Sequence, residues 1–220
     1  MNATAYAGAR ERIISLLHDQ PDEFAPVKTC PGWRVRDVVS HLTGGTDDAL
    51  SGNLEGLASD EWTAAQVERR QDTPLAMIIF EWVANAPRFE PLLDIAGDLG
   101  QMAVADIASH EHDIRGALGA PGARDSDAVR IGLGWVARNV IASAKDHGVA
   151  MRIVSTDGLD LGPHDADATL IANDFELLRA LTGRRSVEQL REMKWEGDVE
   201  RALPAFTWFV LKPAAEPIYE

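Results

Sequence analysis

Apolar residues recur at the spacing of an α-helix through the first two-thirds of the chain, and this periodicity limits the fold more than any other feature. Helix start and stop signals divide the pattern, since Thr73-Pro74 opens one segment and Gly119 and Gly148 end two others. The expected helical segments are 2–17, 35–42, 59–67, 73–83, 99–118 and 126–147. The sequence therefore predicts a bundle of helices in this part of the chain.

From residue 149 onward, shorter elements replace the long helical pattern. A hairpin is expected to turn at Asp157-Gly158, and Ser186 with Gln189 forms a capping-box pattern. The expected elements are strands at 151–154, 159–161, 169–171, one at Trp195 and one at 206–211, and helices at 174–181 and from 186. We therefore expect a helical domain over residues 1–148, followed by a small α+β domain over residues 149–220.

The charge of the chain limits its partners. Its 220 residues carry a formal net charge of -14, so a phosphate backbone or an anionic membrane would be repelled, and we expect neither nucleic acid nor membrane as a partner. The single cysteine, Cys30, excludes an internal disulfide. The sequence has no apolar signal region and no apolar stretch of membrane length, so a cytoplasmic protein is expected.

No P-loop, dinucleotide fingerprint or Ser-His-Asp order is visible, which disfavours nucleotide and triad chemistry.

One expected helix carries charged side chains on the face that should pack into the core. Within residues 99–118, Ile107 and Ile114 share a face, and Asp106 and His110 fall on the same stripe, four residues apart. Burying a carboxylate and an imidazole is costly unless a partner satisfies them. A divalent metal ion satisfies both, because side chains at i and i+4 of a helix can share one ion.

His41 is the natural third ligand. It lies beside Val38 and Leu42, at the margin of the apolar face of the second expected helix. Two imidazoles and one carboxylate leave an open position on zinc, nickel or iron, which water or a substrate can occupy. Two simpler interpretations stay open: Asp106 and His110 can form a surface hydrogen bond, and His41 can be a hydrogen-bonded packing residue.

Three motifs, taken in chain order, resemble those of one known family. They are Thr-Cys-Pro-Gly-Trp-Arg-Val-Arg-Asp-Val-Val-Ser-His-Leu at 29–42, Asp-Ile-Ala-Ser-His-Glu-His-Asp at 106–113, and Leu-Arg-Ala-Leu-Thr-Gly-Arg-Arg-Ser at 178–186. Together they resemble the mycothiol-dependent, maleylpyruvate isomerase-like family, which belongs to the DinB-like metal-binding bundles. The resemblance implies an up-down four-helix bundle followed by a small α+β domain similar to sterol-carrier folds.

By this resemblance, His41 and His110 correspond to the two metal-binding histidines of the family, and Asp106 corresponds to its metal-binding glutamate. The chain departs from the family at Asp106. Aspartate is one methylene shorter than glutamate, so it would draw the ion towards its own helix or bind it less well. It still supplies a hard oxygen ligand, so the site is expected to survive with altered affinity.

The resemblance also implies a metal-dependent isomerase or S-transferase that uses mycothiol, the low-molecular-weight thiol of actinobacteria, on a small electrophilic substrate. An open metal position would bind the thiol sulfur and favour the reactive thiolate. Asp113 would orient His110 or a neighbouring backbone group, or else would only cap the polar edge of its helix. Arg184 or Arg185 would meet a substrate carboxylate, although such arginines are more often surface or ion-pair residues.

Two other classes of function stay open. The chain can be a non-catalytic ligand-binding or regulatory member of the same fold with a degenerate metal site, which the change to Asp106 would fit. It can also be a metal-dependent hydrolase that uses a metal-bound water. We expect a monomer or a homodimer.

Overall fold

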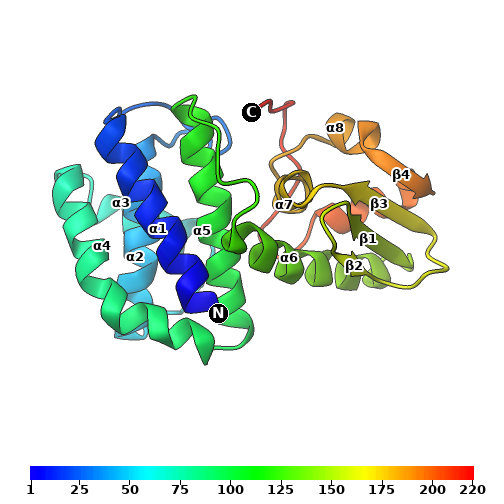
Figure 1. Cartoon of the computed structure of the whole chain (residues 1–220), viewed down its shortest axis with the longest axis horizontal. Coiled ribbons are helices and arrows are strands. Elements are labelled where there is room, and N and C mark those ends of the chain that lie inside the picture. Colours follow the sequence, from blue (N-terminus) through cyan, green and yellow to red (C-terminus); the bar gives the residue numbers. More distant parts are fainter. The chain divides into compact units, whose positions relative to one another are not determined.

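The computed structural model describes all 220 residues, which divide into two compact units, Met1–Gly122 and Ala123–Glu220. The N-terminal unit is entirely helical (Figure 1). Its elements are α1 (Asn2–Asp19), α2 (Val35–Ser51), α3 (Asp60–Glu68), α4 (Leu75–Phe89), the 3-10 helix η1 (Glu90–Asp94) and α5 (Asp98–Ala117). The five helices expected in this part of the chain are therefore present.

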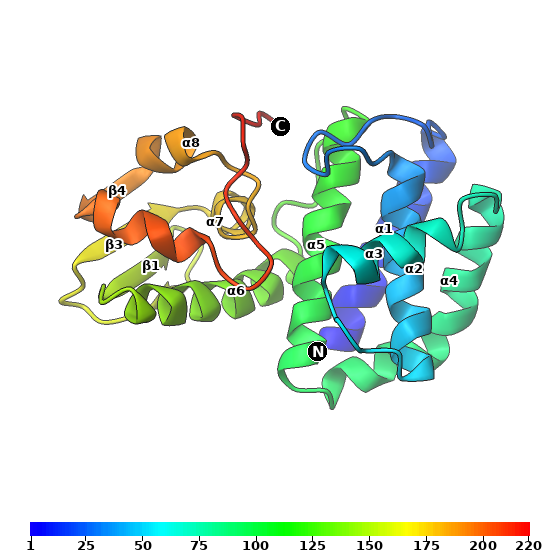
Figure 2. The ribbon, with the colours of Figure 1, turned by 180° about the vertical axis from the view of Figure 1, so that it is seen from behind.

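Four of these helices, α1, α2, α4 and α5, run alongside one another, and α3 lies across α2 (Figures 1 and 2). Their shared core contains Trp82, which is fully buried on α4. The indole Nε1 of Trp82 donates a hydrogen bond to the Tyr6 hydroxyl at 3.3 Å, and the Tyr6 ring meets the Phe89 ring edge to face at 5.2 Å. These aromatic contacts fix α4 against α1 through both apolar and polar atoms.

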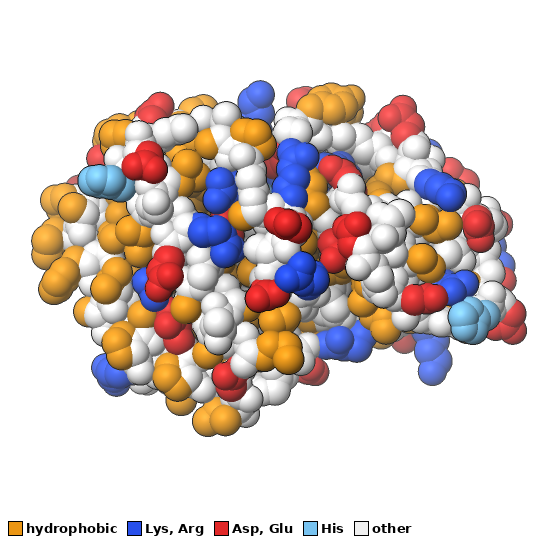
Figure 3. Space-filling view, viewed as in Figure 1, with side chains coloured by type: hydrophobic (Ala, Val, Ile, Leu, Met, Phe, Trp, Pro, Cys, Tyr) orange, Lys and Arg blue, Asp and Glu red, His pale blue; other side chains and the backbone are white.

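Helix α4 is apolar on its outer face as well as on its inner face. Ile78 and Trp82 point into the core, whereas Met77, Phe80 and Val83 are 54%, 66% and 45% exposed. Apolar side chains accordingly gather over α4 at the left of the space-filling view (Figure 3). Neither α4 nor any other helix is both long enough and apolar enough to cross a membrane.

A buried carboxylate joins α1 to α5. The Glu111 side chain is 1% exposed and accepts hydrogen bonds from Arg12 Nε and Nη2 at 2.9 and 2.7 Å, and from Arg115 Nε at 3.1 Å. Charge-assisted bonds of this length are the stronger kind in proteins. Glu111 therefore anchors the helix that carries Asp106 and His110.

The C-terminal unit is an α+β domain. Its elements are α6 (Asp127–Asp146), β1 (Met151–Ser155), β2 (Asp160–Leu161), β3 (Ala168–Ala172), α7 (Asp174–Leu181), α8 (Val187–Glu192), β4 (Lys194–Gly197), α9 (Val199–Ala202) and the 3-10 helix η2 (Leu203–Phe206). The strand order is β2-β1-β3-β4, with β1 parallel to β3 and the other two pairs antiparallel. In this register Leu170 lies between Ile153 and Trp195. The expected fold class, a helical bundle followed by a small α+β domain, is confirmed.

The structure divides the chain earlier than the boundary expected after residue 148. Helix α6 belongs to the C-terminal unit, where it packs against α7, β1 and η2. Its fully buried face includes Val129, Val136 and Val140. Periodicity shows that such a face must be covered, but it does not show which domain covers it.

The strand expected at 206–211 is absent. Phe206 ends η2 instead, and Trp208 and Leu211 pair with each other by backbone hydrogen bonds of 3.0 and 2.8 Å. Phe209, between them, has a positive φ of 51°. The chain therefore reverses within four residues, which an extended strand cannot do.

Candidate metal centre

Three side chains from two helices converge in the N-terminal unit. His41 projects from α2, and Asp106 and His110 project from successive turns of α5. The Nε2 atoms of His41 and His110 lie 3.4 Å from Asp106 Oδ2 and 3.4 Å from Asp106 Oδ1, respectively. Each residue offers one ligand atom, and the three atoms lie within 4.8 Å of one another. The structure thus brings together the three residues that the sequence predicted as ligands.

The exposure of these groups differs from the sequence expectation in one respect. His41 and His110 are 6% and 7% exposed, but the Asp106 side chain is 45% exposed. Asp106 therefore lies at the edge of the bundle and not in the core-facing stripe. Its oxygens can meet solvent on one side and the two imidazoles on the other.

The donor set fits a divalent metal ion. Tetrahedral zinc binds imidazole nitrogen and carboxylate oxygen at about 2.0–2.2 Å, which places neighbouring donor atoms roughly 3.4 Å apart. Each imidazole already has this separation from one of the two Asp106 oxygens, His41 from Oδ2 and His110 from Oδ1. One ligand atom from each of the three residues lies within 4.8 Å of the others. Three protein ligands leave a fourth position open, as in catalytic zinc sites.

The electrostatics of the cluster also favour a cation. Partial desolvation opposes the charge on Asp106, but His110 and His41 outweigh it and hold the pKa of the Asp106 carboxyl well below its usual range. Burial likewise opposes the charge on His110, but the Asp106 charge, together with hydrogen bonds between His110 and Asp113 and between His110 and Cys30, raises the pKa of the His110 imidazole well above its usual value. A metal ion would replace the proton on His110 that the Asp106 carboxylate otherwise stabilises.

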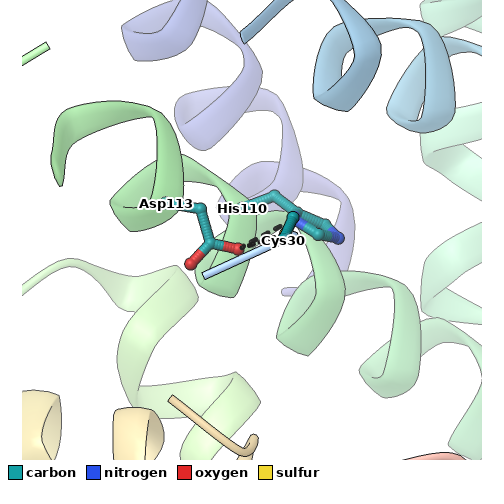
Figure 4. A group of neighbouring side chains, drawn as sticks. All are labelled: Cys30, His110 and Asp113. Carbon is teal, nitrogen blue, oxygen red and sulfur yellow. Dashed lines mark hydrogen bonds and ion pairs between the residues drawn. The ribbon is translucent and has the colours of Figure 1, made fainter. Parts of the chain in front are cut away.

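Asp113 fixes the ring orientation of His110. Its side chain is fully buried, and its Oδ2 lies 2.9 Å from His110 Nδ1 (Figure 4). An ionised carboxylate only accepts hydrogen bonds, so His110 Nδ1 carries a proton and donates it. Asp113 therefore leaves His110 Nε2 directed at Asp106, which is how outer carboxylates commonly orient metal-binding histidines.

The loop before α2 places two further side chains at the cluster. Val27 N–H bonds to the Trp33 carbonyl at 2.9 Å, and Trp33 N–H bonds to the Cys30 carbonyl at 2.9 Å, with Gly32 at a φ of +86°. This tight fold brings Cys30 Sγ within 3.6 Å of Asp113 Oδ2 (Figure 4). A side chain at residue 32 would be strained in this backbone conformation.

Trp33 packs against both histidines, which sequence reasoning missed. Its ring centroid lies 5.5 Å from that of His41 and 6.5 Å from that of His110, and it is nearly parallel to the His110 ring. Sequence analysis gave Trp33 no role at this cluster. Its position in the motif at 29–42 was the one available signal.

A second missed residue supports His41. Gln66, on α3, is fully buried, and its Oε1 lies 2.7 Å from His41 Nδ1. Its amide donates in turn to Asp48 Oδ2 at 2.7 Å. No pattern in the sequence marked Gln66, because a single polar residue on a short helix is usually a surface residue.

The two arginines expected to meet a substrate are occupied within the C-terminal unit. Arg185 is 6% exposed and pairs with Glu176 at 2.9 Å and with Glu220 at 3.4 Å. Arg184 donates from Nη1 to the Thr182 carbonyl at 2.6 Å. The structure thus gives Arg185 two carboxylate partners of its own.

Comparison with known proteins adds evidence on the family and the fold. Residues 7–103 match the family model of the mycothiol maleylpyruvate isomerase N-terminal domain. The match covers less than half of the chain, and these residues are similar to that domain. The resemblance inferred from the three motifs is therefore confirmed. The match contains His41 and ends before Asp106, so it covers one of the three converging residues.

Solved structures extend the likeness to most of the chain. The crystal structure of the mycothiol-dependent maleylpyruvate isomerase superposes with a TM-score of 0.58 at 12% identity, covering 83% of this chain and 88% of that chain. A histidine-to-alanine mutant of that isomerase gives a TM-score of 0.57 at the same identity and coverage. At this identity the likeness establishes the fold. A search of curated proteins gives no significant match.

Proposed function

We propose that this chain is a metal-dependent enzyme that uses a low-molecular-weight thiol, mycothiol, to isomerise a small electrophilic substrate or to transfer the thiol to it. The observation that carries the proposal is the convergence of His41, Asp106 and His110, with both Nε2 atoms turned towards one carboxylate. Zinc is the ion that this donor set suits best, and nickel or iron can take the same ligands.

Each residue of the cluster has a separate task in this proposal. His41 and His110 supply neutral nitrogen donors, and Asp106 supplies a negative charge that reduces the net charge of the site. Bound there, the ion supplies an open position at which a thiol sulfur loses its proton more readily. Asp113 holds His110 in place, and Trp33 shields both imidazoles on one side. The exposed edge at Asp106 leaves a side from which a small molecule can approach.

The two reaction outcomes differ in the fate of the thiol. In an isomerisation, the thiolate adds to an unsaturated carbon, the bond to be isomerised rotates, and the new C–S bond then breaks and returns the thiol. In a transfer, the C–S bond persists, a proton is taken up, and one thiol is consumed for each product. Measuring free thiol together with substrate isomer therefore separates the two activities.

The first experiment is elemental analysis of the purified, untagged protein beside two variants. The wild type is expected to hold about one equivalent of zinc, as a single three-ligand site requires. His110→Ala is expected to lose the metal because it removes one ligand. His147→Ala is the matched control, because His147 is exposed in the C-terminal unit and should leave the metal content unchanged.

Thiol assays follow only if the metal is present. Mycothiol and maleylpyruvate are the first pair to test, with conversion expected in the wild type and lost in His110→Ala. Absence of metal from the wild type, even after reloading with zinc, would refute the metalloenzyme proposal. The better proposal would then be a non-catalytic ligand-binding module of the same fold. Metal binding with hydrolysis in place of thiol chemistry would favour the hydrolase.

A further inference from the structure

His41 is supported by a buried chain of hydrogen bonds that leads away from the candidate metal centre. Its Nδ1 lies 2.7 Å from Gln66 Oε1, and Gln66 Nε2 lies 2.7 Å from Asp48 Oδ2. Arg69 and Asn53 complete the chain, because both donate to Asp48. Gln66 is fully buried and Asp48 is 3% exposed, so solvent cannot replace these partners.

The direction of every bond in this chain is set by Asp48. Burial opposes its charge, but hydrogen bonds from Asn53, Gln66 and Arg69 hold the pKa of the Asp48 carboxyl below its usual value. An ionised carboxylate accepts hydrogen bonds and cannot donate them. Gln66 must therefore turn its NH2 group to Asp48 and its carbonyl oxygen to His41. A carbonyl oxygen can only accept, so the proton lies on His41 Nδ1.

The backbone of α2 makes room for this arrangement. A Cβ atom on Gly44 would lie 2.6 Å from Gln66 Cβ and 2.7 Å from Gln66 Cγ. Such contacts are shorter than real Cβ atoms show, so any larger residue would push Gln66 away from its position. Glycine at this point lets α3 approach α2 closely enough for Gln66 to reach His41.

We propose that Gln66, held by Asp48, is a positioning residue that keeps the proton of His41 on Nδ1 and leaves Nε2 free as a metal ligand. The part that concerns the metal rests on the proposed function; the position of the proton does not. His110 has the same orientation but a different partner, because Asp113 is a carboxylate and Gln66 is a neutral amide. The two histidines of the cluster are thus held by chemically distinct supports.

The test is the protonation of His41 Nδ1 in the metal-free full chain, measured from long-range ¹H–¹⁵N correlations of ¹⁵N-labelled histidine. The His41 signals are assigned by their loss in His41→Gln. The ¹⁵N shift of Nδ1 shows whether this atom carries a proton, whatever the state of Nε2. In the wild type, Nδ1 is expected to be protonated.

Asp48→Asn changes this pattern without touching His41. Asn53 donates to Asp48 Oδ1 alone, and Arg69 lies closer to Oδ1 (2.8 Å) than to Oδ2 (3.0 Å). The asparagine therefore keeps its oxygen at the Oδ1 position and turns its NH2 group towards Gln66. Gln66 must then present its oxygen to Asn at 48 and its NH2 group to His41. The Nδ1 atom of His41 is expected to lose its proton, and zinc affinity is expected to fall about 10- to 100-fold, as for other outer partners of metal ligands.

Asp47→Asn is the matched control. Asp47 precedes Asp48 on α2, but its side chain is 51% exposed and pairs with Arg70 at 3.7 Å. It should leave both the Nδ1 signal and zinc affinity unchanged. Gln66→Leu is a second variant, used where Asp48→Asn does not fold, and it should populate both neutral forms of the His41 ring.

The outcomes separate this inference from the proposed function. A wild-type Nδ1 without a proton, an unchanged Nδ1 signal in Asp48→Asn, or a single Nδ1-protonated form in Gln66→Leu would each overturn the inference. If the wild type shows the expected Nδ1 proton but binds no zinc, the proposed function fails and the positioning role of Gln66 stands.

Discussion

Replacing Glu111 by glutamine tests whether the buried carboxylate between α1 and α5 stabilises the fold. Glu111 is 1% exposed and receives three hydrogen bonds from two arginines. Glutamine has nearly the same shape, but it removes the charge and turns an NH2 group towards an arginine that also donates. The variant therefore leaves buried positive charge without its partner.

The expected cost follows from the exposure of the partners. Removing one member of a buried ion pair typically costs about 3–5 kcal/mol. The Arg12 and Arg115 side chains are 33% and 14% exposed, so water recovers part of the loss. We expect the free energy of unfolding to fall by about 3 kcal/mol, and the melting temperature to fall by roughly 6–12 °C for a chain of this size.

The assay is urea unfolding followed by tryptophan fluorescence, with Glu11→Gln as the control. Glu11 lies on α1, its side chain is 71% exposed, and it pairs with Arg10 at 3.8 Å. Its replacement should change the free energy of unfolding by less than about 0.5 kcal/mol. A Glu111→Gln protein within about 0.5 kcal/mol of the wild type would refute the reasoning, because it would show that the network adds no net stability.

Two further predictions concern backbone packing and pH. Gly100→Ala on α5 should destabilise the protein by about 1–3 kcal/mol, because the new Cβ would lie 2.1 Å from the Leu93 carbonyl oxygen. In Gly134→Ala on α6, the new Cβ would meet only the end of the Arg138 side chain, at 3.7 Å. This variant should raise the free energy of unfolding by up to about 1 kcal/mol. Equal effects of the two changes in thermal or urea unfolding would contradict this account. The second prediction concerns pH. The lowered pKa of Asp48 stabilises the fold above the usual carboxyl pKa, and this contribution is lost as the pH falls through the lowered value. The difference in free energy of unfolding between the wild type and Asp48→Asn should therefore become smaller at acid pH. A difference that stays constant from neutral to acid pH would contradict the stabilising role of the ionised Asp48 carboxylate.

Much of the local structure could be predicted from the sequence. The helix expected at 99–118 is observed at 98–117, and that expected at 126–147 is observed at 127–146. On the first of these, the spacing of Asp106, His110 and Asp113 is fixed by the helical repeat alone. Contacts between residues three or four apart depend only on the backbone of one helix, so their pattern is readable without the rest of the fold.

Tertiary structure decided how that helix is completed into a site. The sequence offered His41 as the third ligand, but only packing places its Nε2 atom 3.4 Å from Asp106. The support of His41 by Gln66 joins two helices through residues 25 positions apart, and the loop before α2 brings Cys30 to Asp113 across 83 positions. Neither contact leaves a periodic signal, because each depends on how separate elements pack.

The domain boundary was decided in the same way. The sequence determined by itself that the segment now seen as α6 is a helix with one apolar face, since periodicity is a property of neighbouring residues. It did not determine that this face would be covered by α7, β1 and η2 in the second unit. Burying an apolar face lowers the free energy of the folded state whichever element of suitable shape covers it. The packing of the whole fold therefore determines which elements cover the face.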